Sequence, residues 1–541
     1  MHNCFKLIRP AILALLLLGL TQAAYGQLTQ LRLPPSRLRE RLMREDIIKK
    51  NLARLKIMQL NEPERKTAVW FEENRYNPQL RWIFLSEMPK GADLHNDLMG
   101  AAFAENLLKF AAQNGKCINT ENYSLEDPPC HPATSPPAIE VINDDELRNL
   151  VIDAWSMRNF PANKNGYRHY LSTFRKFQSA IQGHKGDILA EILQRAAKQN
   201  VLYVEIPLPI ASKLSRELGD RAGIGASYKS IFKHMRQSGL DMVIDAARVD
   251  LNRMTQNLNE KLGCNSTHSK PGCYVKARFL YQVDRNLPPN EVFAEMAVGF
   301  MLVKTDPMVA GVNLSIPEDG GVAIRDYSKQ MDMLDYFHKK FPTVYLSLTA
   351  GDLVQGLVPP QELTFHIREA ISTAHASRIE QGIDIAYEKN PEKLMNSMKQ
   401  KKILVLSCLA TDNNFLGLNN ENVPLTFYLN NHVPVALATC DEGINRSDLT
   451  NEFEIASTSF DIGYPELKEF ARNSLEYSFL GGGSLWGNYD RLIRVTPCLQ
   501  DIPGKGEPKG KCAAYLADNL RAKEEWQLEA QFSRFEANYD H

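Results

Sequence analysis

The sequence predicts an α/β protein built as a (β/α)8 barrel, in which eight parallel strands form a closed ring with helices outside. Short apolar runs recur from about residue 88, and longer segments with helical spacing of apolar residues separate them. Eight such runs are present, which is the number of strands that closes this kind of barrel. An open, doubly wound sheet is the alternative, but no G-x-G-x-x-G follows the first run to support it.

The composition fits a large globular protein. The chain has 541 residues, of which 44% are hydrophobic and 23% charged, and both fractions are near the globular average. Its 63 Lys and Arg balance 64 Asp and Glu, so it has no basic field for nucleic acid. These values exclude a disordered chain, a collagen and a multi-span membrane protein.

Residues 1–26 are typical of a secretory signal peptide. Lys6 and Arg9 precede an apolar run over 11–20, and Ala24-Tyr25-Gly26 supplies a small-x-small cleavage site. The run is too short to span a bilayer. We therefore expect export, either to a periplasm or out of the cell, with no membrane span.

Export makes disulfides possible, and three pairs of cysteines lie close in sequence. The pairs are Cys117 with Cys130, Cys264 with Cys273, and Cys498 with Cys512. Each pair brackets a stretch rich in Pro, Asn or Gly, which predicts a surface loop closed by a disulfide, with buried free thiols as the alternative. Cys408 and Cys440 end two neighbouring predicted strands, so a bond between them is possible and stays open.

The predicted elements follow a clear order along the chain. A helical N-terminal extension covers 27–87, with amphipathic helices over 34–62 whose mixed charges favour a packing or dimer face. The barrel covers 88–490, with an insertion at about 115–165, and a tail covers 491–541 with a helix at 517–538. The strands are expected at 91–95, 201–207, 275–283, 309–315, 344–349, 377–380, 403–408 and 433–439. Helices are expected at 187–199, 242–262, 289–304, 327–340 and 360–375.

Polar residues stand at the carboxyl ends of the predicted strands, where barrels of this class carry their chemistry. His95 and Asp97 share one face of the first strand because they are two residues apart. Cys440 or Asp441, after the eighth strand, could add a third ligand to a metal. The alternative for His95 is a hydrogen-bonded histidine at the mouth of the barrel.

Three segments make the sequence recognisable: residues 88–97 (MPKGADLHND), 365–370 (FHIREA) and 473–480 (NSLEYSFL). They resemble the adenosine/AMP deaminase family, in the same order, over about residues 70–490. The signal peptide, helical extension and early cysteine-bearing insertion resemble its secreted branch, the adenosine deaminase-related growth factors. The resemblance implies a metal-dependent hydrolase barrel, a zinc cofactor, a purine nucleoside ligand and a homodimer.

The same resemblance implies a changed metal site. The family opens its barrel with His-x-His, both zinc ligands; here the first is His95 and the second position holds Asp97. The fifth strand of the family carries His-Ala-Gly-Glu, where this chain has Thr349 in place of the ligand and the shorter Asp352 in place of the acid. The eighth strand carries Thr-Asp-Asp, where this chain has Cys440 in place of the zinc-binding acid.

The remaining family positions concern catalysis and substrate. Gln381 replaces the histidine that orients the attacking hydroxide, and Asp441 keeps the second acid of the eighth strand. Asp352, Gln381 and Asp441 are therefore the catalytic positions, and His95, Asp97 and Cys440 the metal positions. Gly311 and Glu318 match a substrate-binding segment, with a solvated loop acid as the alternative for Glu318.

Three functions remain open from the sequence. The first is a catalytically inactive or strongly impaired deaminase-fold protein that binds a purine nucleoside-like molecule or a protein. The second is an active hydrolase or deaminase with a remodelled metal site, against which a disulfide between Cys408 and Cys440 would count. The third is a secreted structural or growth-factor-like dimer with no pocket ligand.

Overall fold

The structure, a computed structural model, describes residues 57–161, 164–223, 225, 227–314 and 317–539. The predicted signal peptide and most of the helical segment predicted at 34–62 lie outside these residues. The chain divides into two units, Met1–Arg65 and Lys66–His541, and the barrel belongs to the second. Within the described part of the chain, every helix is too short or too polar to cross a bilayer.

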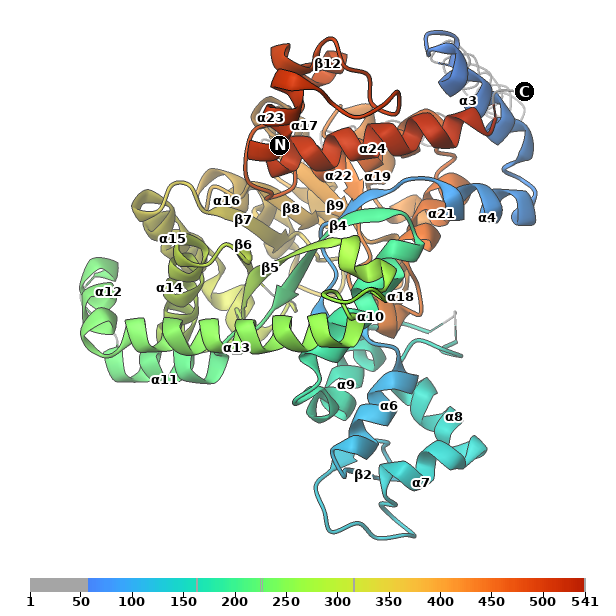
Figure 1. Cartoon of the computed structure of the whole chain (residues 1–541). Helices are drawn as coiled ribbons and strands as arrows, with labels where there is room; N and C mark the ends of the chain where they lie inside the picture. Colours follow the sequence, from blue (N-terminus) through green and yellow to red (C-terminus); the bar gives the residue numbers. More distant parts are fainter. Residues whose placement is uncertain (1–56, 162–163, 224, 226, 315–316, 540–541) are drawn as a thin grey trace, which may run out of the picture. The chain divides into compact units, whose positions relative to one another are not determined.

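Eight parallel strands form the predicted barrel (Figure 1). They are β1 (Gly91–Asp93), β4 (Val201–Leu208), β5 (Lys276–Val283), β6 (Val309–Leu314), β7 (Tyr345–Ala350), β8 (Arg378–Gln381), β9 (Leu404–Ser407) and β10 (Val435–Leu437). Each strand pairs with the next along the chain. The ring closes beyond β10, where Cys440 N donates to His95 O at 2.8 Å and Asp97 N donates to Cys440 O at 2.7 Å.

Strands β4, β8 and β9 are buried at every position, because helices cover their outer face and side chains fill the ring. An ion pair lies in this interior, with Arg378 Nη2 2.6 Å from Glu205 Oε2. The same guanidinium lies 4.2 Å from the ring centre of Phe479. Both charges therefore have partners inside the barrel.

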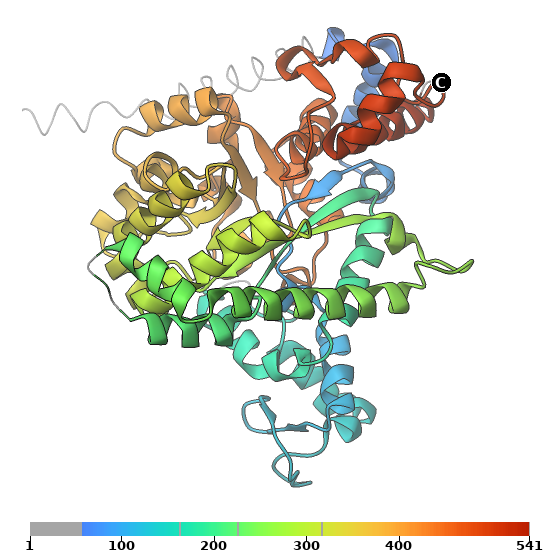
Figure 2. The ribbon, with the colours of Figure 1, turned by 60° about the vertical axis from the view of Figure 1, so that its left-hand side comes forward.

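Helices surround the strands, and the long α13 crosses the front of the view in Figure 2. They are α10 (Lys185–Lys198), α11 (Ser212–Ala222), α12 (Tyr228–Gln237), α13 (Leu240–Leu262), α14 (Pro289–Thr305), α15 (Gly321–Lys340), α16 (His366–Ser372), α17 (Pro391–Lys401), α18 (Leu409–Phe415), α19 (Leu425–Asn430), α20 (Glu442–Asn445), α21 (Leu449–Ser459) and α22 (Tyr464–Glu476). The helix predicted at 360–375 is divided, because Phe365 adopts φ −152° between a 3-10 turn and α16.

The segment between β1 and β4 holds several small elements, drawn at the lower end of Figure 1. They are α5 (Leu98–Ala101), α6 (Ala104–Gln113), β2 (Cys117–Ile118), β3 (Leu125–Glu126), α7 (Ala138–Asn143), α8 (Asp145–Ala154) and α9 (Tyr167–Phe177). The disulfide Cys117–Cys130 lies here as predicted, and Cys264–Cys273 closes the loop after α13.

The C-terminal segment packs beside the barrel. It contains β11 (Trp486–Asn488), β12 (Ile493–Arg494), α23 (Gly510–Asp518) and α24 (Leu520–Ala537), so the helix predicted at 517–538 is α24, which begins after Asn519. The predicted disulfide Cys498–Cys512 is buried in a small apolar cluster with Leu485 and Trp526. Lys468 of α22 contacts Glu536 of α24 at 2.5 Å. Before β1 lie α3 (Glu62–Asn74) and α4 (Pro78–Glu87).

Short 3-10 turns complete the chain. They are η2 (Gln178–Ile181), η3 (Pro271–Tyr274), η4 (Pro360–Thr364), η5 (Ile383–Tyr387), η6 (Asn420–Asn422), η7 (Tyr489–Arg491) and η8 (Thr496–Cys498). Of these, η4 and η5 flank the helix and strand that lead to the mouth of the barrel.

Candidate ligand site at the mouth of the barrel

A cavity of about 710 Å³ opens at the carboxyl ends of the strands. Polar residues at or just after the ends of seven barrel strands line it. They are His95, Asp97, Gln282, Asn313, Thr349, Asp352, Glu380, Gln381, Thr411, Cys440 and Asp441. The apolar part of the lining consists of Met99, Leu171, Phe174, Pro209 and Pro317, and the charged side chains of Arg175, Arg216, Asp284 and Glu295 also line the cavity. The volume suits a small organic ligand, and a lining that combines apolar and polar groups is usual for such sites.

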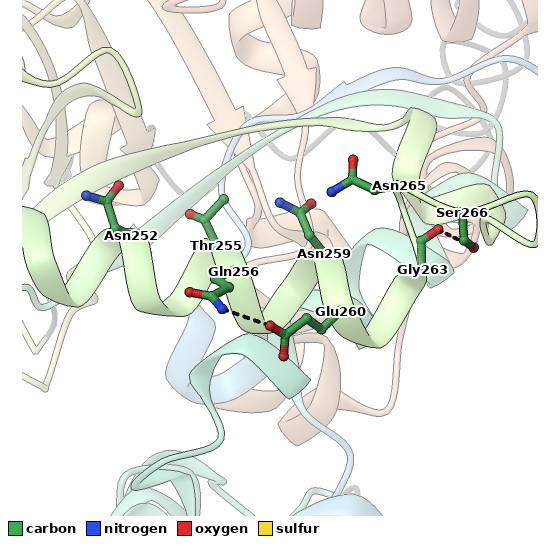
Figure 3. Close-up of a pocket in the computed structure, with 8 residues that line it drawn as sticks. All are labelled: Asn252, Thr255, Gln256, Asn259, Glu260, Gly263, Asn265 and Ser266. Atoms are coloured by element: carbon green, nitrogen blue, oxygen red, sulfur yellow. Dashed lines mark hydrogen bonds between the residues drawn. The ribbon is translucent and has the colours of Figure 1, made fainter.

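A second hollow, shown in Figure 3, lies along α13 and the loop that follows it. Its lining is almost entirely neutral polar side chains, and Glu260 is its one charged residue. No strand contributes to it, so it lies apart from the site that the sequence predicts.

His95 lies at the end of β1 in a buried ion pair with Glu380 of β8. The two atoms that face one another, His95 Nδ1 and Glu380 Oε2, are 3.1 Å apart. Burial alone would lower the pKa of His95, but the Glu380 carboxylate outweighs it and raises that pKa to about 9. His95 is therefore an imidazolium at neutral pH in this arrangement.

Glu380 is the residue that the sequence reasoning did not select. Its carboxylate accepts hydrogen bonds from Asn313 Nδ2 at 2.7 Å, from Thr349 Oγ1 at 2.9 Å and from Ser347 Oγ. Burial opposes its ionisation, but His95 and Arg378 hold the pKa of Glu380 below its usual value. The available signal was the place of Glu380 beside Gln381 at the end of the sixth predicted strand.

Asp97, expected as a metal ligand, has both oxygens engaged. Its Oδ2 accepts a hydrogen bond from Gln282 Nε2 at 2.7 Å, and its Oδ1 accepts one from Met99 N at 2.8 Å. The second bond makes Asp97 the N-cap of α5. Burial raises the pKa of the Asp97 carboxyl. Asp97 thus acts in the structure as a helix cap and a partner of Gln282.

Asp441, the residue after Cys440, is 3% exposed and lines the same cavity. Its Oδ2 accepts from Tyr170 Oη at 2.6 Å, whereas Oδ1 is buried with no hydrogen-bond partner. Gly100 leaves the room for this carboxylate, because a Cβ there would lie 1.8 Å from Oδ1. Burial and the nearby Asp97 raise the pKa of Asp441 to about 7.

Cys440 is joined to Cys408 by a disulfide that links the ends of β9 and β10. With its sulfur in this bond, Cys440 has no thiolate to offer a metal, which corrects its assignment as a ligand for the oxidised protein. Gln381 Nε2 lies 3.9 Å from the Cys440 sulfur. Both Cys440 and Gln381 adopt positive φ, at 56° and 71°, which costs backbone energy at residues other than glycine.

Asp352 reaches the floor of the cavity from the loop after β7, with Oδ1 buried and without a hydrogen-bond partner. Burial and the charge of Glu318 raise its pKa to about 8. Glu318 itself does not line the cavity: its oxygens accept from Asp352 N at 2.8 Å and Gly351 N at 3.2 Å, and contact His366 Nδ1 at 2.6 Å. Glu318 therefore holds the Asp352 loop and is neither a ligand-lining residue nor a solvated acid.

Gly311, the other residue predicted to bind substrate, is also absent from the lining. It lies early in β6, where a Cβ would be 2.8 Å from Phe479 Cδ2 and 2.9 Å from the Tyr345 carbonyl oxygen. The absence of a side chain at Gly311 lets the Phe479 ring pack directly against the strand.

The residues in this arrangement do not fit the zinc ion that the family implies. His95, Asp97 and Asp441 each have a protein partner, the Cys440 sulfur is oxidised, and Thr349 donates its hydroxyl to Glu380. Across the described residues, no group of three or more His, Cys, Asp or Glu side chains is placed to hold a metal ion.

The fold and the polar mouth define the class of protein, a (β/α)8 barrel with a cavity at the carboxyl ends of its strands. Residues 360–484, which include β8, β9 and β10, match the adenosine deaminase family. This segment of the chain is thus similar to adenosine deaminases.

Individual adenosine deaminases are similar in sequence to part of this chain. An adenosine deaminase of Clostridium perfringens (strain 13) is 28% identical over 158 residues, covering 25% of this chain and 46% of the relative. An adenosine deaminase of Shewanella denitrificans is 27% identical over 113 residues, which cover 21% of this chain and 33% of the relative. The chain thus spans less than half the length of these relatives.

Two solved structures are also similar. An adenine deaminase from Arthrobacter aurescens has 16% identity and a TM-score of 0.47, covering 73% of this chain and 94% of that one. Arabidopsis ADAL complexed with GMP has 18% identity and a TM-score of 0.47, and the match covers 74% of this chain and 94% of that one.

Proposed function

We propose that this chain is an exported adenosine deaminase-like protein that binds a purine nucleoside-like molecule and has lost, or nearly lost, zinc-dependent deamination. The observation that carries the proposal is the Cys408–Cys440 disulfide, because it removes a thiolate from the floor of the cavity. The His95–Glu380 ion pair supports it, since it engages the one zinc ligand that the resemblance retains.

The acid–base positions support the same proposal. Gln381 has no titratable group, so it cannot accept a proton from an attacking water. Asp352 is one methylene shorter than the glutamate of the family, and Glu318 holds the backbone of its loop. Hydrolytic deamination needs both an activated water and a proton carrier, and groups that act as a unit are not replaced one at a time.

Ligand binding needs neither of these groups. Phe174 offers an aromatic face to a planar base, and the polar side chains that line the same cavity offer hydrogen-bond donors and acceptors. The family match supports a purine as the base. Four disulfides support export, because such bonds persist in oxidising compartments.

The test uses the oxidised mature protein. Elemental analysis measures its metal content, calorimetry measures adenosine and inosine binding, and an ammonia assay measures turnover in the same sample. We expect binding without zinc and without turnover. About one zinc per chain together with adenosine turnover would overturn the proposal in favour of an active hydrolase.

Two variants locate the binding. Phe174→Ala removes an aromatic ring from the cavity wall and should weaken nucleoside binding about tenfold. Phe110→Ala is the matched control, because Phe110 stacks on His184 outside the cavity. Equal effects of the two variants would place the ligand elsewhere.

A further inference from the structure

A third hollow lies at the opposite end of the barrel from the mouth. Its volume is about 520 Å³, and Tyr345, Ser377 and Lys402 are among the residues that line it. They stand at or just before the first residues of β7, β8 and β9, so the hollow opens at the amino ends of three neighbouring strands. We call it the amino-end hollow. It shares no lining residue with the cavity at the mouth.

Tyr345 offers an aromatic face to the amino-end hollow. Its ring stacks on that of Phe479, with the ring centres 4.9 Å apart and the planes inclined by 12°. Phe479 is buried, whereas Tyr345 is 46% exposed. Phe479 thus covers one face of the Tyr345 ring, and the other face is left for a planar group.

Positive charge gathers in the same hollow. Lys401 and Lys402 are adjacent at the end of α17, and both are exposed and line the hollow. Neither ammonium forms an ion pair or a hydrogen bond with another residue that the structure describes. Arg521 adds a third cation, because its two Nη atoms donate to the carbonyl oxygens of Glu476 and Gly482, at 3.0 and 3.1 Å, and not to a carboxylate.

Glu476 is the acid among the described residues that line the hollow, and its carboxylate is engaged. Its Oε2 accepts a hydrogen bond from Ser484 Oγ at 2.6 Å. The neighbouring Glu525 is neutral, because burial and then the Glu476 carboxylate raise the pKa of Glu525 well above its usual value. His375 also lines the hollow and is paired with Asp335, at 3.1 Å. Three cations therefore outweigh one carboxylate, and the lining is net positive.

A hydroxyl adds a neutral hydrogen-bond donor. Ser377 Oγ accepts a hydrogen bond from Leu346 N at 3.4 Å and donates to none of the described residues. The pairing of β7 with the start of β8 fixes its place, because Ser377 N donates to Leu346 O at 2.9 Å. The proton of this hydroxyl is thus available to an anion in the hollow.

We infer that the amino-end hollow binds a small aromatic phosphate, that is, a planar ring that bears a phosphate group. The ring stacks on the open face of Tyr345, and the phosphate lies at the ammonium groups of Lys401 and Lys402 and the hydroxyl of Ser377. Two adjacent lysines suit a phosphate, because it carries between one and two negative charges at neutral pH and accepts several hydrogen bonds. This site is separate from the mouth and does not rest on the proposed function.

Calorimetry with phenyl phosphate on the oxidised mature protein tests the site. We expect phenyl phosphate to bind, and phenol and inorganic phosphate to bind at least about tenfold more weakly, because each lacks one of the two recognised groups. The affinity should fall as NaCl is added, since salt screens the exposed lysines. Equal affinities for phenyl phosphate and inorganic phosphate, or no binding of either, would overturn the inference.

Paired lysine variants locate the phosphate. Lys401→Gln combined with Lys402→Gln should weaken phenyl phosphate binding about tenfold. The matched control is Lys393→Gln combined with Lys399→Gln, which removes the same charge from exposed positions of α17 that do not line the hollow. Equal losses of affinity in the two double variants would contradict the inference, because they would reflect net charge alone.

Tyr345→Leu tests the ring contact. Leucine keeps an apolar contact with Phe479 but offers no aromatic face, so the affinity for phenyl phosphate should fall about fivefold. Affinity for inorganic phosphate should not change. Circular dichroism checks the fold of this variant, and the exposed lysine variants give the answer if it does not fold.

Adenosine separates the amino-end hollow from the mouth. An excess of adenosine should leave phenyl phosphate binding unchanged, and displacement of phenyl phosphate would place it at the mouth and overturn the inference. The lysine variants give their result whether or not adenosine binds, so this inference and the proposed function stand or fall separately.

Discussion

His95 Nδ1 and Glu380 Oε2 lie 3.1 Å apart in a buried ion pair that joins the end of β1 to β8 across the mouth of the barrel. Thr349 faces Glu380 in the register of β7 with β8 and donates its hydroxyl to the same carboxylate oxygen. A cationic imidazole and its carboxylate thus line the cavity as a pair, and this arrangement underlies the first prediction.

Glu380→Gln should lower the free energy of unfolding by about 3 kcal/mol, because it leaves the His95 imidazolium buried without its counter-charge. Urea denaturation measures the loss. The control is Lys339→Gln, which breaks an exposed ion pair with Asp335 and should change stability by less than about 0.5 kcal/mol. In a double-mutant cycle with His95→Gln, strictly additive losses would contradict the coupling of these two residues.

Asp352 gives a pH dependence of stability with a defined sign. Its pKa is raised from 3.8 to about 8 in the folded protein by burial and by Glu318. The folded carboxyl stays neutral while the unfolded one ionises, so its stabilising contribution is complete below about pH 4, falls as the pH rises, and is lost by about pH 8. Relative to Asp352→Asn, the wild-type protein should lose up to about 1.4 kcal/mol per pH unit within this window.

Denaturation of both proteins at pH 4.5, 6 and 7.5 measures that difference. Other buried acids also have raised pKa values, such as Asp93 at about 7 and Glu452 at about 8. Their contribution to the pH dependence of stability is the same in both proteins, so it cancels in the comparison. A constant difference between the two proteins across the window would show that Asp352 is ionised in the folded state.

Gly311→Ala should destabilise the protein by about 1–3 kcal/mol, because the new Cβ would lie 2.8 Å from Phe479 and 2.9 Å from the Tyr345 backbone. Gly321→Ala is the matched control: no atom lies within 4 Å of its Cβ, and it stands at the start of α15. Thermal unfolding compares them. If Gly311→Ala is as stable as the control but binds no nucleoside, Gly311 is a ligand-contact residue after all.

Cys264→Ser combined with Cys273→Ser should lower stability by about 2–3 kcal/mol, because the disulfide restrains the unfolded chain over a short loop. Nucleoside binding should be unchanged, since neither residue lines the cavity. Denaturation and calorimetry on the same preparation give both values. A tenfold loss of affinity with full stability would mean that this loop communicates with the mouth of the barrel.

The fold was predictable from local patterns. Each of the eight predicted runs became a strand of the barrel, because strands buried on both faces are rich in apolar residues. Helix ends were less predictable: Phe365 interrupts the helix predicted at 360–375, and α24 begins at Leu520 where the prediction had 517. Periodicity records which face is buried and does not record where the backbone turns.

The candidate site divides in the same way. The sequence by itself determined that His95, Asp97, Asp352, Gln381, Cys440 and Asp441 stand at strand ends, and a barrel brings such ends to one mouth. Only the tertiary structure decided which partner each side chain takes: Glu380 for His95, Gln282 for Asp97, Tyr170 for Asp441 and Cys408 for Cys440. Partners 32 to 285 residues apart are chosen by strand register and side-chain direction, which no local pattern contains.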